Sequence, residues 1–136
     1  YRGQCAEFCG IQHARMAFLI IAEPQEEFDA WLAQQQAPRP EPTDPLVQAG
    51  RTAFMRPSCM GCHAIRGTPA QGQLGPDLSD FGSRRTIAGA TLPNNPGTVA
   101  AWIANPQELK PGNQMPDLNI DLQTARAIAA YLETLR

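Results

Sequence analysis

The sequence predicts a mainly α-helical domain at residues 46–136, preceded by a short β/α segment and a linker. Three observations predict this fold class. Apolar residues recur at helical spacing near both ends of the C-terminal part, a stretch rich in Gly, Pro, Ser and Thr separates them, and a run of prolines divides the chain. We therefore divide the 136 residues into a segment at 1–36, a linker at 37–45 and a domain at 46–136.

The first segment is expected to form a strand followed by a helix. Residues 15–23 are apolar and partly β-branched, whereas Phe28, Trp31 and Leu32 recur at helical spacing within residues 26–35. A chain of fewer than about 40 residues rarely folds alone without a metal, a disulfide or a partner. We therefore interpret residues 1–36 as the C-terminal end of a larger domain.

The linker contains Pro38, Pro40 and Pro42 and ends at Pro45. Alternating prolines favour extended polyproline II, which has no hydrophobic face to bury. At about 3.1 Å per residue, roughly eleven such residues would reach about 35 Å. We expect a fairly stiff connection.

Three helices are expected in the C-terminal domain, each after a capping residue. Asp44 precedes Pro45, Asn95 precedes Pro96, and Asp121 precedes the last apolar stripe. Short polar side chains cap free N–H groups, and proline suits the first helical position. The apolar positions of the second and third helices are Val99, Trp102 and Ile103, then Ala125, Ile128, Ala129, Leu132 and Leu135.

The first and last helices are predicted to cross closely, because Gly50 carries no side chain and shares a face with Leu46 and Phe54. Phe54 and Tyr131 are the expected contacts there. Residues 67–96 look like a loop that wraps around a bound group.

The composition excludes several classes of protein. The formal net charge is −2 and the largest basic cluster is Arg84-Arg85, so no nucleic-acid partner is expected. The longest apolar run, residues 16–22, is far shorter than the roughly 18 residues that span a bilayer. We expect the chain to be a trimmed piece, with any membrane anchor upstream of Tyr1.

Residues 59–63 read Cys59-Met60-Gly61-Cys62-His63, the C-x-x-C-H pattern that attaches a c-type haem. Two thiols at this spacing can bond one porphyrin edge, and the following histidine can ligate the iron. A zinc site would need four ligands at finger-like spacing, and His63 is the only histidine after the linker.

The sixth iron ligand is predicted to be Met115, in a loop rich in Gly and Pro. Met60 lies inside the attachment motif and Met55 on the helix that enters it, so both are poorer candidates. His13 is an alternative ligand, but it fits a second site better. Methionine opposite histidine raises the reduction potential of haem iron.

Residues 46–136 resemble a class I cytochrome c, a helical fold around haem c. The resemblance includes Gly75-Pro76-Asp77-Leu78, and it implies that the carbonyl of Pro76 orients His63. It also implies that Trp102 donates a hydrogen bond to a haem propionate and that Arg85 pairs with a propionate. A solvated turn is the alternative for Arg84-Arg85.

Four soft or borderline metal ligands lie within residues 5–16: Cys5, Cys9, His13 and Met16. Thiolate, imidazole and thioether together favour copper. Two cysteines four positions apart can bridge a pair of copper ions, and sharing the charge change between two metals suits electron transfer. A Cys5–Cys9 disulfide or free thiols are the alternatives.

This segment resembles the dinuclear copper (CuA) motif in the cupredoxin-like domain of cytochrome c oxidase subunit II. The resemblance implies that Cys5 and Cys9 bridge, that His13 and Met16 are terminal ligands, and that Glu7 ligates through its backbone carbonyl. The family's centre takes a second histidine from an upstream strand, which this sequence lacks.

The order of a copper segment (residues 1–36), a proline linker (37–45) and a cytochrome (46–136) resembles subunit II of the caa-type cytochrome oxidases. The resemblance implies one-electron transfer from haem c to CuA for oxygen reduction in a respiratory chain. It implies a place in the periplasm or on the outer face of a bacterial membrane, with anchor helices absent here. Expected partners are the other oxidase subunits and a donor, such as a quinol-oxidising complex or a small redox protein. The chain would be an electron carrier without an active site of its own.

Two alternatives remain open from the sequence. One is a free-standing periplasmic electron-carrier cytochrome c with an unrelated extension, against which residues 5–16 argue. The other is a haem enzyme such as a peroxidase, which needs an open iron position. Met115 argues against the enzyme.

Overall fold

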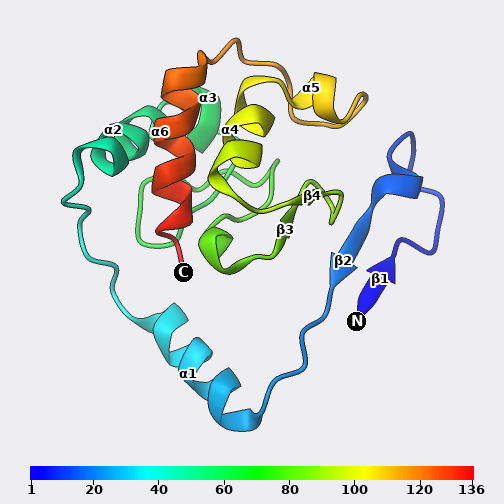
Figure 1. The fold of residues 1–136 in the computed structure, drawn as a ribbon, viewed down its shortest axis with the longest axis horizontal. Helices are drawn as coiled ribbons and strands as arrows, with labels where there is room; N and C mark the ends of the chain where they lie inside the picture. Colours follow the sequence, from blue (N-terminus) through cyan, green and yellow to red (C-terminus); the bar gives the residue numbers. More distant parts are fainter.

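The computed structural model describes all of residues 1–136 and is mainly helical, as the sequence predicts (Figure 1). Short 3-10 turns lie at His13–Arg15 and Phe81–Ser83. None of the helices has the length and apolar character needed to cross a membrane. The other elements, in chain order, are β1 (Arg2–Gln4), β2 (Ala17–Leu19), α1 (Gln25–Gln36), α2 (Pro45–Phe54), α3 (Pro57–Met60), β3 (Thr86–Ile87), β4 (Leu92–Pro93), α4 (Pro96–Ala104), α5 (Pro106–Leu109) and α6 (Leu122–Glu133).

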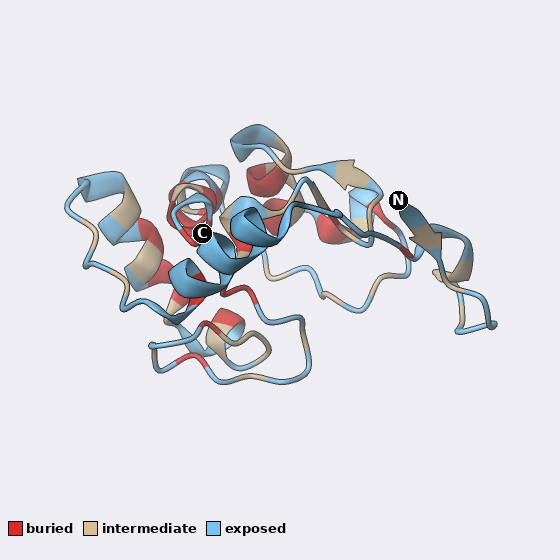
Figure 2. Ribbon diagram, turned by 90° about the horizontal axis from the view of Figure 1, so that it is seen from below, coloured by how far each residue is buried: buried red, intermediate tan, exposed pale blue.

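Helix α6 is the centre of the C-terminal domain and packs against both α2 and α4 (Figure 1). Its buried face presents Ala125, Ile128 and Leu132 to a hydrophobic core that also contains Phe54 and Ile103. Burial is concentrated in these helices, whereas the first residues of the chain are mostly exposed (Figure 2). The predicted apolar stripe of the last helix is therefore confirmed as core.

All three predicted helix caps are confirmed. The side chain of Asp44 accepts a hydrogen bond from the Leu46 amide at 2.8 Å. The side chains of Asn95 and Asp121 each accept one from an amide three residues later, at 2.9 Å in both cases. Each bond satisfies a backbone donor that the helix itself leaves free.

The close crossing of α2 and α6 depends on Gly50. A Cβ atom at this position would lie 1.9 Å from the carbonyl oxygen of Ala127, so no other residue fits without moving a helix. One turn further on, the rings of Phe54 and Tyr131 pack in a tilted arrangement with centroids 6.1 Å apart. Both expectations for this crossing are confirmed.

The N-terminal strand is shorter than predicted. Residues 15–23 were expected to be extended, but β2 covers only Ala17–Leu19, paired antiparallel with β1. The pairing ends with Ile20, whose amide donates to the carbonyl of Tyr1. Many apolar side chains in this segment are exposed, including Phe18, Ile20, Ile21 and Phe28.

The linker at 37–45 is attached to the domain by polar contacts, which the prediction of a stiff extended connection did not include. Arg39 of the linker donates to the carbonyl of Ser79, Arg51 of α2 pairs with Glu41, and the side chain of Gln48 donates to the carbonyl of Pro42 at 2.9 Å. Proline content indicated the lack of an apolar face, but it says nothing about polar side chains that join the linker to the domain.

Candidate metal centres

The attachment motif forms a helical turn that begins in α3. The amides of Cys62 and His63 both bond to the carbonyl of Cys59, at 3.1 and 3.0 Å. Residues three apart on a helical turn lie on the same face, which brings Cys59 and Cys62 to one side. Cys59 is buried, and this burial raises the pKa of its thiol.

Residues 71–78 run alongside this turn. The amide of Gly75 donates to the carbonyl of Cys62 at 2.7 Å, and the Leu78 amide donates to that of Ala64 at 2.8 Å. The ring nitrogen Nδ1 of His63 lies 2.9 Å from the carbonyl oxygen of Pro76. A carbonyl can only accept, so Nδ1 carries the proton and Nε2 is the nitrogen left for a metal.

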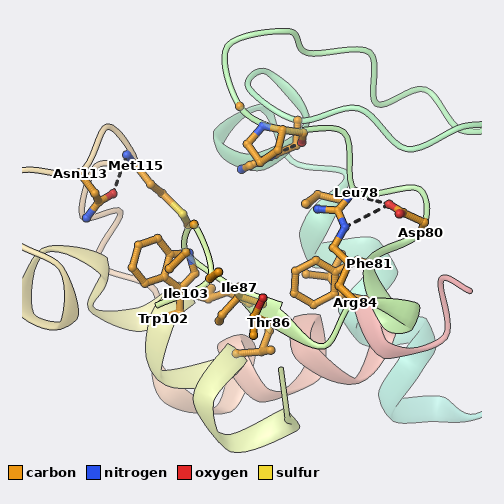
Figure 3. Close-up of a pocket in the computed structure, with 18 of the residues that line it drawn as sticks. Leu78, Asp80, Phe81, Arg84, Thr86, Ile87, Trp102, Ile103, Asn113 and Met115 are labelled. Atoms are coloured by element: carbon orange, nitrogen blue, oxygen red, sulfur yellow. Dashed lines mark hydrogen bonds and ion pairs between the residues drawn. The ribbon is translucent and has the colours of Figure 1, made fainter. Parts of the chain in front are cut away.

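A cavity of about 1200 Å³ lies beside the motif and is lined mostly by apolar side chains. Cys59, Cys62, His63 and Met115 all line it, although the methionine comes more than 50 residues after the histidine. Figure 3 shows Met115 and Trp102 extending from one side and Phe81 and Arg84 from the other. The cavity exceeds the roughly 300–1,000 Å³ of most small-ligand sites, as a large planar group would require.

Met115 is held in place by two side chains that the sequence reasoning missed. The amide group of Gln107 donates to the carbonyls of Asn113 and Met115, at 2.9 and 2.6 Å, and its oxygen accepts from the Gly112 amide at 3.1 Å. The side chain of Asn113 accepts from the Met115 amide at 2.8 Å (Figure 3). Gln107, eight positions before Met115, was the only indication in the sequence that side chains support this loop.

The two expected propionate partners also line the cavity. Trp102 comes from α4 and is half-buried, and the guanidinium of Arg85 makes no hydrogen bond or ion pair within the protein, although its backbone carbonyl accepts from the Asn94 amide. Its neighbour Arg84 is engaged instead: it pairs with Asp80 and donates to the carbonyl of Asp77 at 2.6 Å. The two arginines therefore differ, because only Arg85 keeps its charge free for a bound anion.

The residues present fit a haem c. Two thiols are on one side of a helical turn, an imidazole has a fixed tautomer, and a thioether lines the same apolar cavity. Met55 and Met60, the weaker candidates, do not line this cavity. His13 lies elsewhere, in the cluster described next.

The expected copper ligands are brought together in one small cluster. The sulfur atoms of Cys5 and Cys9 are 3.5 Å apart, and Cys9 Sγ lies 3.8 Å from His13 Nδ1 and 3.7 Å from Met16 Sδ. The thiol of Cys5 is also 3.1 Å from the carbonyl oxygen of Glu7. Both cysteines are free, so the disulfide alternative is wrong for this structure.

The cluster fits a soft metal cation. The neighbouring Cys5 raises the pKa of the Cys9 thiol, first through their hydrogen bond and, after a contribution from burial, through its charge. Two adjacent thiolates repel each other unless a cation compensates them, and a bound metal reverses that balance. Thiolate, imidazole and thioether donors select copper over harder ions.

Comparison with known proteins places the C-terminal domain. The family model for cytochrome c matches residues 47–136, which is well over half of the chain. The chain belongs to the cytochrome c family. A solved structure, the c-type cytochrome SorU from Sinorhizobium meliloti, matches 66% of this chain and 90% of its own at 21% identity, with a TM-score of 0.47.

Three curated relatives match almost the whole chain. Each is a cytochrome c oxidase subunit 2. Those of Alkalihalophilus pseudofirmus and Bacillus sp. PS3 are 43% and 38% identical over 100% of this chain, and that of Bacillus subtilis is 30% identical over 95%. The chain spans only 37–39% of the length of these relatives.

Proposed function

We propose that this chain is the cytochrome-bearing part of a cytochrome c oxidase subunit 2, and that it relays single electrons from an outside donor to the copper centre of the same subunit. The observation that carries this proposal is the common cavity of Cys59, Cys62, His63 and Met115. The copper-type cluster at residues 5–16, in the same chain, supports the direction of transfer.

In this proposal Cys59 and Cys62 hold haem c by thioether bonds, and His63 and Met115 ligate its iron. Bound haem supplies a one-electron couple. The hydrogen bond to Pro76 fixes the ring of His63 and leaves Nε2 for the iron, whereas the neutral thioether of Met115 would favour the reduced state. With His63 and Met115 as its two iron ligands, the haem would keep no open position for a substrate.

Trp102 and Arg85 would hold the propionates. Arg85 has a free guanidinium at the cavity wall, and Trp102 has an indole N–H as its only polar group. Pairing with these side chains would neutralise part of the negative charge that the group brings into an apolar cavity. The apolar lining of the cavity would keep reorganisation around the iron small.

Cys5, Cys9, His13, Met16 and the carbonyl of Glu7 would hold the copper pair. The exposed apolar side chains in and beside this cluster, such as Phe8 and Ile20, support the view that residues 1–36 belong to a larger copper domain. That domain would also contribute the second histidine. The assignment places the chain outside the cytoplasmic membrane of a bacterium, where c-type haem is attached and a respiratory donor would be met.

The alternative is a free-standing electron carrier. The cluster of Cys5, Cys9 and His13, whose ligand atoms lie within 4.8 Å of one another, argues against it. An unrelated extension has no reason to gather three such groups. A haem enzyme of the peroxidase type would need an open iron position, and Met115 lines the cavity where that opening would be.

The first test is the visible absorption spectrum of the protein, oxidised and then reduced with dithionite. Sharp haem c bands after reduction, together with a weak methionine-to-iron band in the oxidised form, are expected. A high-spin spectrum would point to an enzyme or sensor, and the absence of haem bands would overturn the assignment of Cys59, Cys62 and His63. Stopped-flow reduction of the complete oxidase, following haem c and copper separately, tests the direction of transfer.

A further inference from the structure

Residues 11–17 of the copper segment contact the cytochrome domain around Lys110. The ammonium group of Lys110 donates to the carbonyls of Arg15 and Ala88, at 2.8 and 2.6 Å. Beside it, the amide of Ala17 donates to the carbonyl of Gly89 at 3.0 Å. One amine therefore joins two backbone segments that are separated by more than 70 residues in the sequence.

The loop that carries Met115 takes part in the same contact. The side chain of Gln12 donates to the carbonyl of Pro111, and a Cβ atom on Gly112 would lie 3.0 Å from a methyl group of Ile11. Gln12 is the residue before His13, and Pro111 follows Lys110 directly. The copper-ligand loop and the haem-ligand loop thus lie against each other.

The turn that receives the copper segment has an unusual backbone. Ala88, Gly89 and Ala90, between β3 and β4, have φ angles of 55°, 68° and 55°. Alanine rarely adopts the left-handed region, and such conformations persist only where the surroundings fix them. Here the turn presents the carbonyls of Ala88 and Gly89 to Lys110 and Ala17, which explains why the strained form is kept.

Lys110 itself is an unusual residue for this position. It is the only lysine of the chain, it is 6% exposed, and no carboxylate pairs with it. A buried ammonium group is destabilising unless hydrogen bonds replace its water. One of the two acceptors that replace water, the Arg15 carbonyl, belongs to the copper segment, so burial of Lys110 depends on that segment being in place.

We propose that residues 12–17, 88–91 and 110–112 form the docking contact through which the copper segment is held against the haem domain during electron transfer. This inference rests on the proposed function. It identifies the surface that would hold the copper segment against the haem domain. Arg15 and Ala17 flank the expected copper ligand Met16, and Lys110 lies five residues before Met115. The contact therefore joins the two ligand loops by direct backbone and side-chain hydrogen bonds.

The test uses the complete oxidase and the variant Lys110→Met, which keeps the length of the side chain and removes its charge and donors. The first readout is hydrogen exchange of the Ala17 amide, resolved by fragmentation mass spectrometry. This amide reports on the contact because it donates to the carbonyl of Gly89. We expect this amide to be protected in the native enzyme and to exchange about tenfold faster in the variant. The second readout is the haem-to-copper transfer rate, which we expect to fall by about tenfold.

Arg126→Met is the matched control, because Arg126 is an exposed cation on α6 that makes no contact with the copper segment. It should change neither readout. Gln12→Leu loosens the contact from the copper side and should accelerate exchange at Ala17 as Lys110→Met does. The methionine-to-iron band must be unchanged in each variant, which separates loss of docking from damage to the haem site.

The possible outcomes separate the two proposals. If the native enzyme shows no haem-to-copper transfer but Ala17 is protected, the proposed function fails and the docking contact stands as a structural one. If transfer occurs while Ala17 exchanges freely, or if Lys110→Met matches the control in both readouts, the docking inference is overturned.

Discussion

The ring of His63 lies directly against the backbone of Gly75: a Cβ atom on this glycine would be 2.6 Å from Cε1 and 2.7 Å from Nδ1 of the imidazole. The same ring is held on Nδ1 by the carbonyl of Pro76, the next residue. The short segment after the attachment motif thus fixes the histidine both by contact and by a hydrogen bond.

Gly75→Ala is expected to displace His63 and to weaken the hydrogen bond to Pro76. Inserting a methyl group into a packed site is destabilising by about 1–3 kcal/mol. Guanidinium unfolding should show this loss, and the oxidised spectrum should gain a high-spin component. Gly97→Ala is the control, since the added Cβ would only meet Asn95 at an ordinary distance of 3.5 Å. Equal behaviour of the two variants would contradict the proposed role of Gly75.

Met115→Ala is expected to leave haem attached, because the thioether bonds involve only Cys59 and Cys62. The iron would lose its sixth ligand, so the ferrous protein should bind carbon monoxide readily. Absorbance changes on adding carbon monoxide measure this directly. Met60→Ala, which alters a methionine outside the cavity, should leave the reduced protein unreactive. An unchanged low-spin spectrum in Met115→Ala would refute the ligand assignment.

The ligand loop of Met115 illustrates what the sequence could and could not predict. That Met115 lines the same cavity as His63 was predictable, because a Gly/Pro-rich loop far from the attachment motif is where a closing ligand is expected. Its hydrogen-bond support from Gln107 was not, since a glutamine on a short helix has no pattern that distinguishes it from a solvated one. Side-chain to backbone bonds across a loop depend on the final path of the chain.

The fold, too, has features that the sequence could predict and features that it could not. The caps at Asp44, Asn95 and Asp121 follow from local chemistry, and all three were predicted. The left-handed turn at residues 88–90 was not, because alanine gives no indication of a positive φ. The pairing of β1 with β2 was missed for a similar reason: residues 2–4 show no apolar alternation, and only the partner strand reveals them.

Gln107→Ala is expected to loosen the methionine loop without unfolding the domain. Three hydrogen bonds of about 0.5–1.5 kcal/mol each would be lost, which amounts to about 2–4 kcal/mol of loop stability. The methionine-to-iron band should then disappear at a lower guanidinium concentration than the helical circular dichroism signal. In the control Gln123→Ala, on the exposed side of α6, both signals should respond as in the unmodified protein. Coincident transitions in Gln107→Ala would mean that the loop is held by other contacts.

Asp77 is expected to contribute stability that depends on pH. Burial alone would raise the pKa of its carboxyl, but hydrogen bonding by Ser79 and the charges of Arg66 and Arg84 outweigh burial and lower the pKa. A carboxyl whose pKa is lower in the folded state stabilises the fold above its unfolded pKa, about 3.9 for aspartate, and loses that effect as the pH falls through the folded value. Asp77→Asn should therefore lower the melting temperature near neutral pH.

The difference between Asp77→Asn and the unmodified protein should shrink as the pH is lowered from about 4 through the lower pKa of the folded state, because the carboxyl of the folded protein then becomes protonated as well. Thermal unfolding followed by circular dichroism between pH 2 and pH 7 measures this directly. Glu108→Gln removes an exposed carboxylate that makes no hydrogen bond and should show no comparable trend. A melting-temperature difference for Asp77→Asn that stays constant across this range would mean that Asp77 acts through packing of the Ser79 turn and not through its charge.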